Sequence, residues 1–153
     1  MVSRLLVVHH TPSPATAELL AAVLAGANDP EITGVEVVAR AALAATASDL
    51  LAADAVALGT PANIGYMSGA LKHFFDQVFY VCQADTTGLP YGCWVHGNLG
   101  LEGAVSGIRS IADGLDWTAV AAPVEVVGAP DRAAREACYE LGAVLAATIA
   151  PDG

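Results

Sequence analysis

The segment from residue 55 to residue 80 constrains the fold most, because a strand pattern, a long loop and a helix pattern follow one another in it. The apolar run 55–58 ends at Gly59 and predicts a buried strand. The small and polar residues that follow, 60–69, form a loop too long for a simple connection. Apolar residues then recur on one helical face, at Ala70, Leu71, Phe74, Phe75, Val78 and Phe79. Loops at the carboxyl ends of parallel strands are where open α/β sheets bind ligands, so we expect a binding site at this loop.

Strand and helix patterns alternate along the whole chain. Apolar runs predict strands over residues 4–8, 35–39, 55–58, 92–96 and 120–127, the last of them interrupted by Pro123. Helix patterns follow them over residues 14–26, 41–51, 70–79, 104–115 and 130–149. Ser13 suits the N-cap of the first helix, and Pro14 suits its first turn. This alternation predicts an α/β fold with a three-layer, doubly wound, five-stranded parallel sheet in the order 2-1-3-4-5.

Composition excludes several classes of protein. The length of 153 residues fits one domain, for which we expect the bounds 1–153. The formal net charge of −10 argues against nucleic acid and anionic membranes as partners, and no apolar run is long enough for membrane insertion. The chain begins directly with a strand pattern, so we expect no signal peptide. Its cysteines, Cys82, Cys93 and Cys138, are odd in number and lack metal-binding spacing, which favours a cytoplasmic protein with reduced thiols and no metal.

The loop of the central segment carries a family resemblance. Pro61, Gly65, Met67 and Ser68, followed by Lys72, Phe74 or Phe75, and Asp76, resemble the flavin-binding loop of flavodoxin-like quinone reductases and NADPH-dependent FMN reductases. The resemblance implies a flavodoxin-like fold with FMN as cofactor. It also implies that the chemistry belongs to the cofactor, and the sequence offers no catalytic nucleophile, acid or base.

Residues 11–16 are the candidate phosphate loop, because hydroxyls cluster there at the start of a helix. Thr11, Ser13 and Thr16 match the hydroxyl positions of the flavodoxin phosphate loop, whereas Pro14 replaces its glycine. The loop contains no lysine or arginine, so the amides of Ser13, Ala15 and Thr16 are the expected donors. The alternative is a plain helix start that binds nothing. The loop lacks the residues that a tyrosine phosphatase, a P-loop NTPase or a receiver domain would need.

The resemblance places the flavin ring between two loops. In the first loop, the expected ring-binding residues are Pro61, Ala62, Asn63, Ile64, Gly65, Tyr66 and Met67. A backbone amide near Gly65 is expected to reach the flavin N5, while Tyr66 or Met67 packs at the ring edge; surface packing for Tyr66 and core filling for Met67 are the alternatives. In the second loop, the candidates are His96, Gly97, Asn98 and Gly100. Asn98 has the donor and acceptor atoms to hydrogen-bond the pyrimidine edge of the flavin. His96 either lies near the flavin N1 or O2, where it would stabilise the reduced anion, or has a structural role.

Three functions remain open from the sequence. The first is two-electron transfer from NAD(P)H to a quinone or flavin acceptor, although nothing in the sequence resembles a site for the NADPH 2′-phosphate. The second is a one-electron carrier whose acidic surface docks a basic redox protein, which predicts slow turnover with NAD(P)H. The third is a binding domain of the same fold without flavin, favoured by Pro14 and by the uncharged phosphate loop. A homodimer is compatible with each of them.

Overall fold

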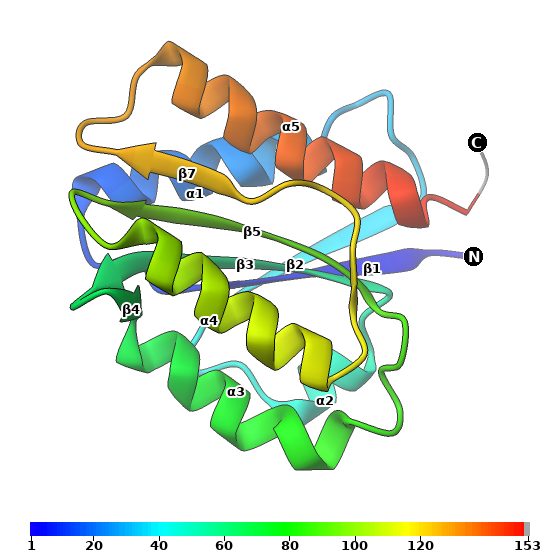
Figure 1. Ribbon diagram of the computed structural model, residues 1–153. Coiled ribbons are helices and arrows are strands. Elements are labelled where there is room, and N and C mark those ends of the chain that lie inside the picture. The colour runs from blue at the N-terminus through cyan, green and yellow to red at the C-terminus, as the bar shows by residue number, and fades with distance from the viewer. Residues whose placement is uncertain (152–153) are drawn as a thin grey trace.

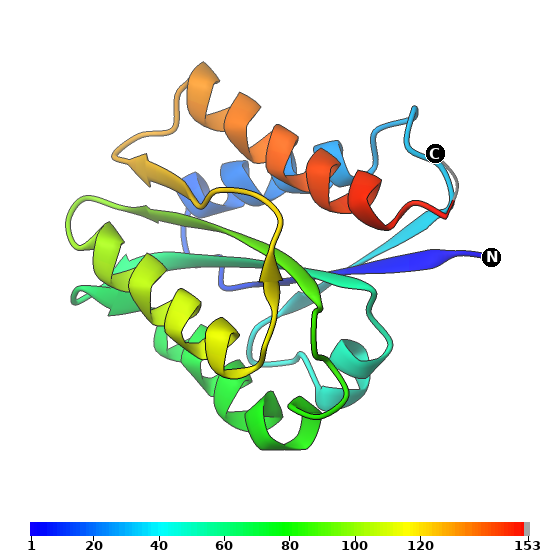
Figure 2. The same ribbon diagram turned by 45° about the vertical axis from the view of Figure 1, so that its right-hand side comes forward.

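The computed structural model describes residues 1–151 and has three layers, with a parallel sheet between two layers of helices (Figures 1 and 2). The helices are α1 (Pro14–Ala27), α2 (Ala47–Leu51), α3 (Gly69–Cys82), α4 (Leu101–Gly114) and α5 (Arg132–Ile149). The strands are β1 (Ser3–His9), β2 (Val35–Ala41), β3 (Ala55–Asn63), β4 (Tyr66–Met67), β5 (Pro90–Gly97), β6 (Thr118–Ala119) and β7 (Val124–Val127). Helices α1 and α5 cover one face of the sheet, and α2, α3 and α4 cover the other (Figure 1).

The strand order confirms the predicted topology. Strands β2, β1, β3 and β5 lie side by side in parallel, and both β6 and β7 pair with β5 at the fifth position. The fifth strand differs from the prediction in detail, because residues 120–123 leave the ladder between β6 and β7. Tyr91 pairs with Ala119 and Trp94 with Val124. The segment from Ala119 to Val124 is therefore longer than the segment of β5 beside it, and the extra residues bulge out of the ladder. Pro123 lacks a backbone N–H, which explains why the ladder is interrupted there.

Helix α2 is shorter than the predicted helix over residues 41–51. Its start is fixed by Thr46, whose hydroxyl accepts from the Asp49 backbone N–H while the Asp49 carboxylate accepts from the Thr46 N–H. This capping box satisfies donors that the helix end leaves free. The alanine-rich residues before it are not helical. The sequence did not show this boundary, because alanine gives little contrast between buried and exposed positions.

Two hydrophobic clusters, one on each face of the sheet, hold the layers together. On the α2–α4 face, Phe74 and Phe75 of α3 are buried together with Ile108 of α4. On the other face, α1 and α5 pack closely because Gly26 and Gly142 carry no side chains at their contact. A Cβ at Gly142 would lie 2.0 Å from the Val23 carbonyl oxygen, so these two helices touch backbone to backbone.

All three cysteines are free thiols buried in the core. Burial raises the pKa of the Cys93 thiol to about 12 and that of Cys138 to about 11, and it also raises the pKa of Cys82. Within residues 1–151, no helix has both the length and the apolar character that crossing a membrane requires.

We expect the native thiols to resist modification at pH 8. A thiol with a pKa of about 12 is ionised in only about one molecule in ten thousand at that pH, and the thiolate is the nucleophile. The test is the rate of reaction with a disulfide reagent, with and without denaturant. Three thiols should react rapidly after unfolding and slowly before it. Rapid reaction of a native thiol would contradict the buried positions described here.

Candidate functional site

Three loops meet at the carboxyl ends of the central strands, on the left of Figure 1. They follow β1, β3 and β5, which are neighbours in the sheet. His9 pairs with Gly59, and Pro61 pairs with His96, so the register brings the beginnings of the three loops to one edge. The structure therefore gathers the predicted phosphate loop and both predicted ring loops at that edge.

The first ring loop is a β-hairpin, which the sequence did not predict. Strand β3 continues to Asn63, the chain turns at Ile64 and Gly65, and the two-residue strand β4 pairs Met67 with Ala62 and Tyr66 with Asn63. Ile64 and Gly65 have φ values of 52° and 71°, in the left-handed region that this kind of two-residue turn requires. Glycine adopts that region freely, whereas a β-branched residue is strained there. Ile64 is also fully exposed, so the fold holds a strained apolar side chain at the edge where the loops meet.

We expect Ile64→Asn to stabilise the free protein. Asparagine tolerates the left-handed region, and Asn-Gly is a favoured pair for such a turn, so the free energy of unfolding should rise by about 1 kcal/mol. Urea unfolding of the variant and of the parent measures this difference. Leu99→Asn serves as a control, since it removes an exposed apolar side chain from a residue without a positive φ. If Ile64→Asn were no more stable than the parent, the turn would not carry the strain assigned to it.

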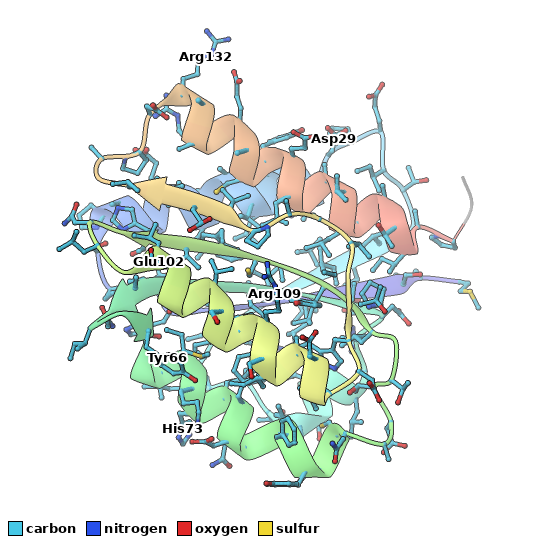
Figure 3. The ribbon with its side chains drawn as sticks, viewed as in Figure 1. Asp29, Tyr66, His73, Glu102, Arg109 and Arg132 are labelled. Carbon is cyan, nitrogen blue, oxygen red and sulfur yellow. The ribbon has the colours of Figure 1, made fainter. Side chains whose placement is uncertain are left out.

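The two residues of β4 face different environments. Met67 is only 2% exposed and belongs to the core, which is the core-filling alternative for this residue. Tyr66 lies beside α4 (Figure 3), and its ring occupies the space that a side chain at Gly107 would need. A hydrogen bond fixes the base of the hairpin: the Ser68 backbone N–H donates to the buried Thr60 hydroxyl at 2.9 Å. The tip of the hairpin thus projects from a fixed base.

The second ring loop packs against the tip of the hairpin through glycines. A Cβ at Gly100 would lie 2.7 Å from Gly65 Cα, and one at Gly103 would lie 1.9 Å from the Gly65 carbonyl oxygen. Gly100 also has a φ of 75° at the N-cap of α4, a conformation suited to glycine. Before Gly100, the side chains of Asn98 and Leu99 are exposed.

His96 makes a structural contact in the described structure. Its Nε2–H donates a hydrogen bond of 2.8 Å to the Gly128 carbonyl oxygen, which links the end of β5 to the chain after β7. Gly97 lies next to it, and a Cβ there would be 3.2 Å from the Ala62 Cβ and 3.4 Å from a Leu101 methyl carbon, a tight fit for a side chain. The position of His96 agrees with the structural alternative for this residue.

In the candidate phosphate loop, Ser13 and Thr16 bond to each other. The Thr16 backbone N–H donates to the Ser13 hydroxyl at 3.2 Å, and the Ser13 N–H donates to the Thr16 hydroxyl at 3.0 Å. The Thr16 hydroxyl in turn donates to the Ser13 carbonyl at 2.9 Å and is buried. This capping box starts α1 as the sequence predicts, but it occupies two of the three hydroxyls and two of the three amides that were expected to hold a phosphate.

The remaining groups of this loop are the Ala15 amide, in the first turn of α1, and the Thr11 side chain. The Thr11 hydroxyl shares a hydrogen bond of 2.7 Å with His9 Nδ1. Burial, and to a smaller extent the neighbouring His10, lower the pKa of His9 below its usual value of 6.5. Neither His9 nor Leu99 was predicted as a site residue, although His9 lies only two residues before Thr11. Among residues 1–151, no group of three or more His, Cys, Asp or Glu side chains is arranged to hold a metal ion.

Comparisons with known proteins agree with this architecture. No protein-family model matches the chain. A curated flavodoxin from Aquifex aeolicus (strain VF5) is 36% identical over 77 residues, which are 50% of this chain and 40% of that protein, so the match spans less than half of the relative.

Solved structures match nearly the whole chain. A flavodoxin, WrbA-like protein from Agrobacterium tumefaciens superposes with a TM-score of 0.78 at 21% identity, covering 95% of this chain and 96% of that one. The flavodoxin of Streptococcus pneumonia TIGR4 has a TM-score of 0.78 at 19% identity, covering 96% and 100%. Megasphaera elsdenii flavodoxin has a TM-score of 0.77 at 18% identity, covering 93% and 98%. The chain has the flavodoxin-like fold.

Proposed function

We propose that this chain binds FMN at the carboxyl edge of its sheet and transfers electrons through it. The observation that carries the proposal is the pair of exposed apolar side chains, Ile64 and Leu99, on two loops that Gly65 and Gly100 hold together. A strained backbone position such as that of Ile64 supports a functional role for the loop that carries it. The fold and the relatives with flavodoxin names support FMN as that ligand.

The residues at this edge fit the parts of FMN. The ring would lie between the hairpin residues 61–65 and the loop 97–100, with the amide near Gly65 facing N5 and Asn98 at the pyrimidine edge. The phosphate would lie at the start of α1, held by the Ala15 amide and the Thr11 hydroxyl, since Ser13 and Thr16 bond to each other. Bound flavin supplies the redox chemistry, while the chain binds it, orients it and shields one side of the ring from water.

The test is an FMN titration of the purified protein, followed through the quenching of flavin fluorescence. We expect saturation at one FMN per chain and weaker binding of riboflavin, which lacks the phosphate. The variant Thr11→Val, which removes one hydroxyl, should weaken FMN binding and leave riboflavin binding unchanged. If neither flavin binds, the proposal is wrong. Equal affinity for both would show that the start of α1 does not bind the phosphate.

Within this function we favour an NAD(P)H-dependent reductase of quinones or flavins over a one-electron carrier. The support is the loop that contains Pro61, Gly65, Met67 and Ser68, which resembles the reductase loop. The net charge of −10 favours the carrier instead, because an acidic surface attracts basic redox proteins. Turnover of NADH and NADPH by FMN-loaded protein with a quinone distinguishes them: sustained turnover supports the reductase, and rapid reaction with a basic redox protein alone supports the carrier.

A further inference from the structure

We propose that His9, acting through the Thr11 hydroxyl, supplies the positive charge that stabilises the FMN phosphate, so that FMN affinity falls as the pH rises through neutrality. The proposal rests on the function proposed above. It concerns a residue that would not touch the ligand itself, and His9 is therefore a positioning residue.

The need for such a residue follows from the composition of the loop. Residues 11–16 contain no cation, and the two prolines remove two amide donors. Ser13 and Thr16 bond to each other through their amides, and with the Thr16 hydroxyl donating to the Ser13 carbonyl, the Ser13 hydroxyl donates to the Thr16 hydroxyl oxygen at 2.9 Å. A phosphate with two negative charges would thus meet few free donors, and the nearest group able to carry a positive charge through a hydrogen bond is His9, at 2.7 Å from the Thr11 hydroxyl.

The neighbours of His9 within the sheet are apolar or small. It ends β1 on the face of Leu5 and Val7, since side chains alternate along a strand. Its register neighbours are Ala41 and Gly59, and the indole of Trp94 occupies the space over Gly59. His9 is therefore half-buried beside an apolar ring, in a setting where a charge is costly unless a ligand compensates it.

The charged side chains of α1 and β2 are already paired, and β3 carries none; on α5, Glu140 is exposed and takes part in no ion pair among the described residues. Glu18 of α1 lies 3.4 Å from Arg135 of α5, and Arg40 of β2 lies 3.7 Å from Asp49. His10 is the neighbour whose charge opposes that of His9. A bound phosphate would bring the missing negative charge to the His9–Thr11 pair.

The sign of the pH effect follows from these positions. Burial and His10 lower the pKa of His9 below 6.5, so that its neutral form predominates at pH 7 in the free protein. A nearby dianion raises the pKa of a histidine, and binding therefore takes up a proton. In the bound state, Nδ1–H donates to the Thr11 oxygen and the Thr11 hydroxyl donates to the phosphate. Proton uptake makes binding tighter at low pH, and the gain is lost as the pH rises through the pKa of the bound state.

The experiment measures the dissociation constants of FMN and riboflavin between about pH 6.5 and pH 8.5, a range in which the phosphate itself stays mainly doubly charged because its second pKa is about 6. We expect FMN binding to weaken by about five- to tenfold over this range, while riboflavin binding stays constant. His9→Asn keeps a donor for Thr11 but cannot carry the charge, so its FMN affinity should not depend on pH. The matched control His10→Asn should retain the slope.

The possible outcomes separate a failure of the His9 proposal from a failure of FMN binding itself. Tighter binding of FMN than of riboflavin without any pH dependence would overturn the role of His9 and leave the proposed function standing. The same holds if His9→Asn keeps the slope, or if riboflavin shows it as well. Failure of FMN to bind at any pH would overturn both proposals. The ring pKa of His9, followed by NMR in the unmutated protein, gives a measurement that needs no variant: FMN should raise it, and an unchanged value would contradict the proposal.

Discussion

Replacing Gly142 with alanine should lower the free energy of unfolding by about 2–3 kcal/mol, although alanine is the better helix former by about 1 kcal/mol. Gly142 lies in the middle of α5, where an added Cβ would be 2.0 Å from the Val23 carbonyl oxygen and 2.8 Å from the Ala27 backbone nitrogen. Backbone atoms cannot move aside as a flexible side chain can. The added methyl group would therefore push α1 away from α5 and open the packing of Leu19 and Leu145 between these helices and the sheet.

Urea unfolding of Gly142→Ala against the matched control Gly69→Ala measures this effect. Gly69 begins α3, and a Cβ there would meet nothing within 4 Å, so the same change should leave the stability unchanged or raise it slightly. A loss of stability for Gly142→Ala and no loss for Gly69→Ala is the expected result. An equal gain in both would show that α1 and α5 do not touch backbone to backbone.

The variant Gly103→Val should weaken FMN binding roughly a hundredfold, which corresponds to about 2.8 kcal/mol. A Cβ at Gly103 would lie 1.9 Å from the Gly65 carbonyl oxygen, and valine adds two further methyl groups beyond it. We expect the hairpin tip rather than α4 to shift, because only two residue pairs join β4 to β3. The tip would be displaced, and with it the Gly65 amide and the Ile64 side chain that we assign to the ring.

A second valine on the same helix separates this effect from a general loss of stability. Ser106 is exposed on α4, so Ser106→Val adds the same side chain without a clash. We expect Ser106→Val to bind FMN as the parent does. If Gly103→Val also kept the parent affinity, the hairpin tip would not belong to the flavin site.

The sequence predicted the parts of this fold that local chemistry determines. Helix α1 starts at Pro14 after the Ser13 cap, and the apolar face of α3 around Phe74 and Phe75 is buried as the spacing indicated. The alternation of strands and helices was enough to predict the parallel sheet and its order. These features depend on periodicity and caps, which a short stretch of sequence contains in full.

The parts that the sequence did not predict depend on contacts between distant segments. The sequence did not predict the hairpin around Ile64, because isoleucine is unfavourable in a turn with positive φ. The glycines that pack against this turn, Gly100 and Gly103, also lie in a distant part of the sequence. One local contact was missed as well, because the capping box of Ser13 and Thr16 has threonine in place of the usual Glu or Gln. The bond between His96 and Gly128 joins the end of β5 to the residue after β7, which is 32 positions away in the sequence.

The measurement that tests the account most directly is the change in backbone amide NMR signals when FMN is added to the protein. We expect large shifts at one FMN per chain, confined to the three loops after β1, β3 and β5, with Thr11, Ala15, Gly65 and Asn98 among the most affected residues. Shifts elsewhere would contradict the site, for example at the hollow of about 430 Å³ between residues 120–124 and α5. A spectrum that FMN leaves unchanged would contradict the central claim that this chain binds FMN.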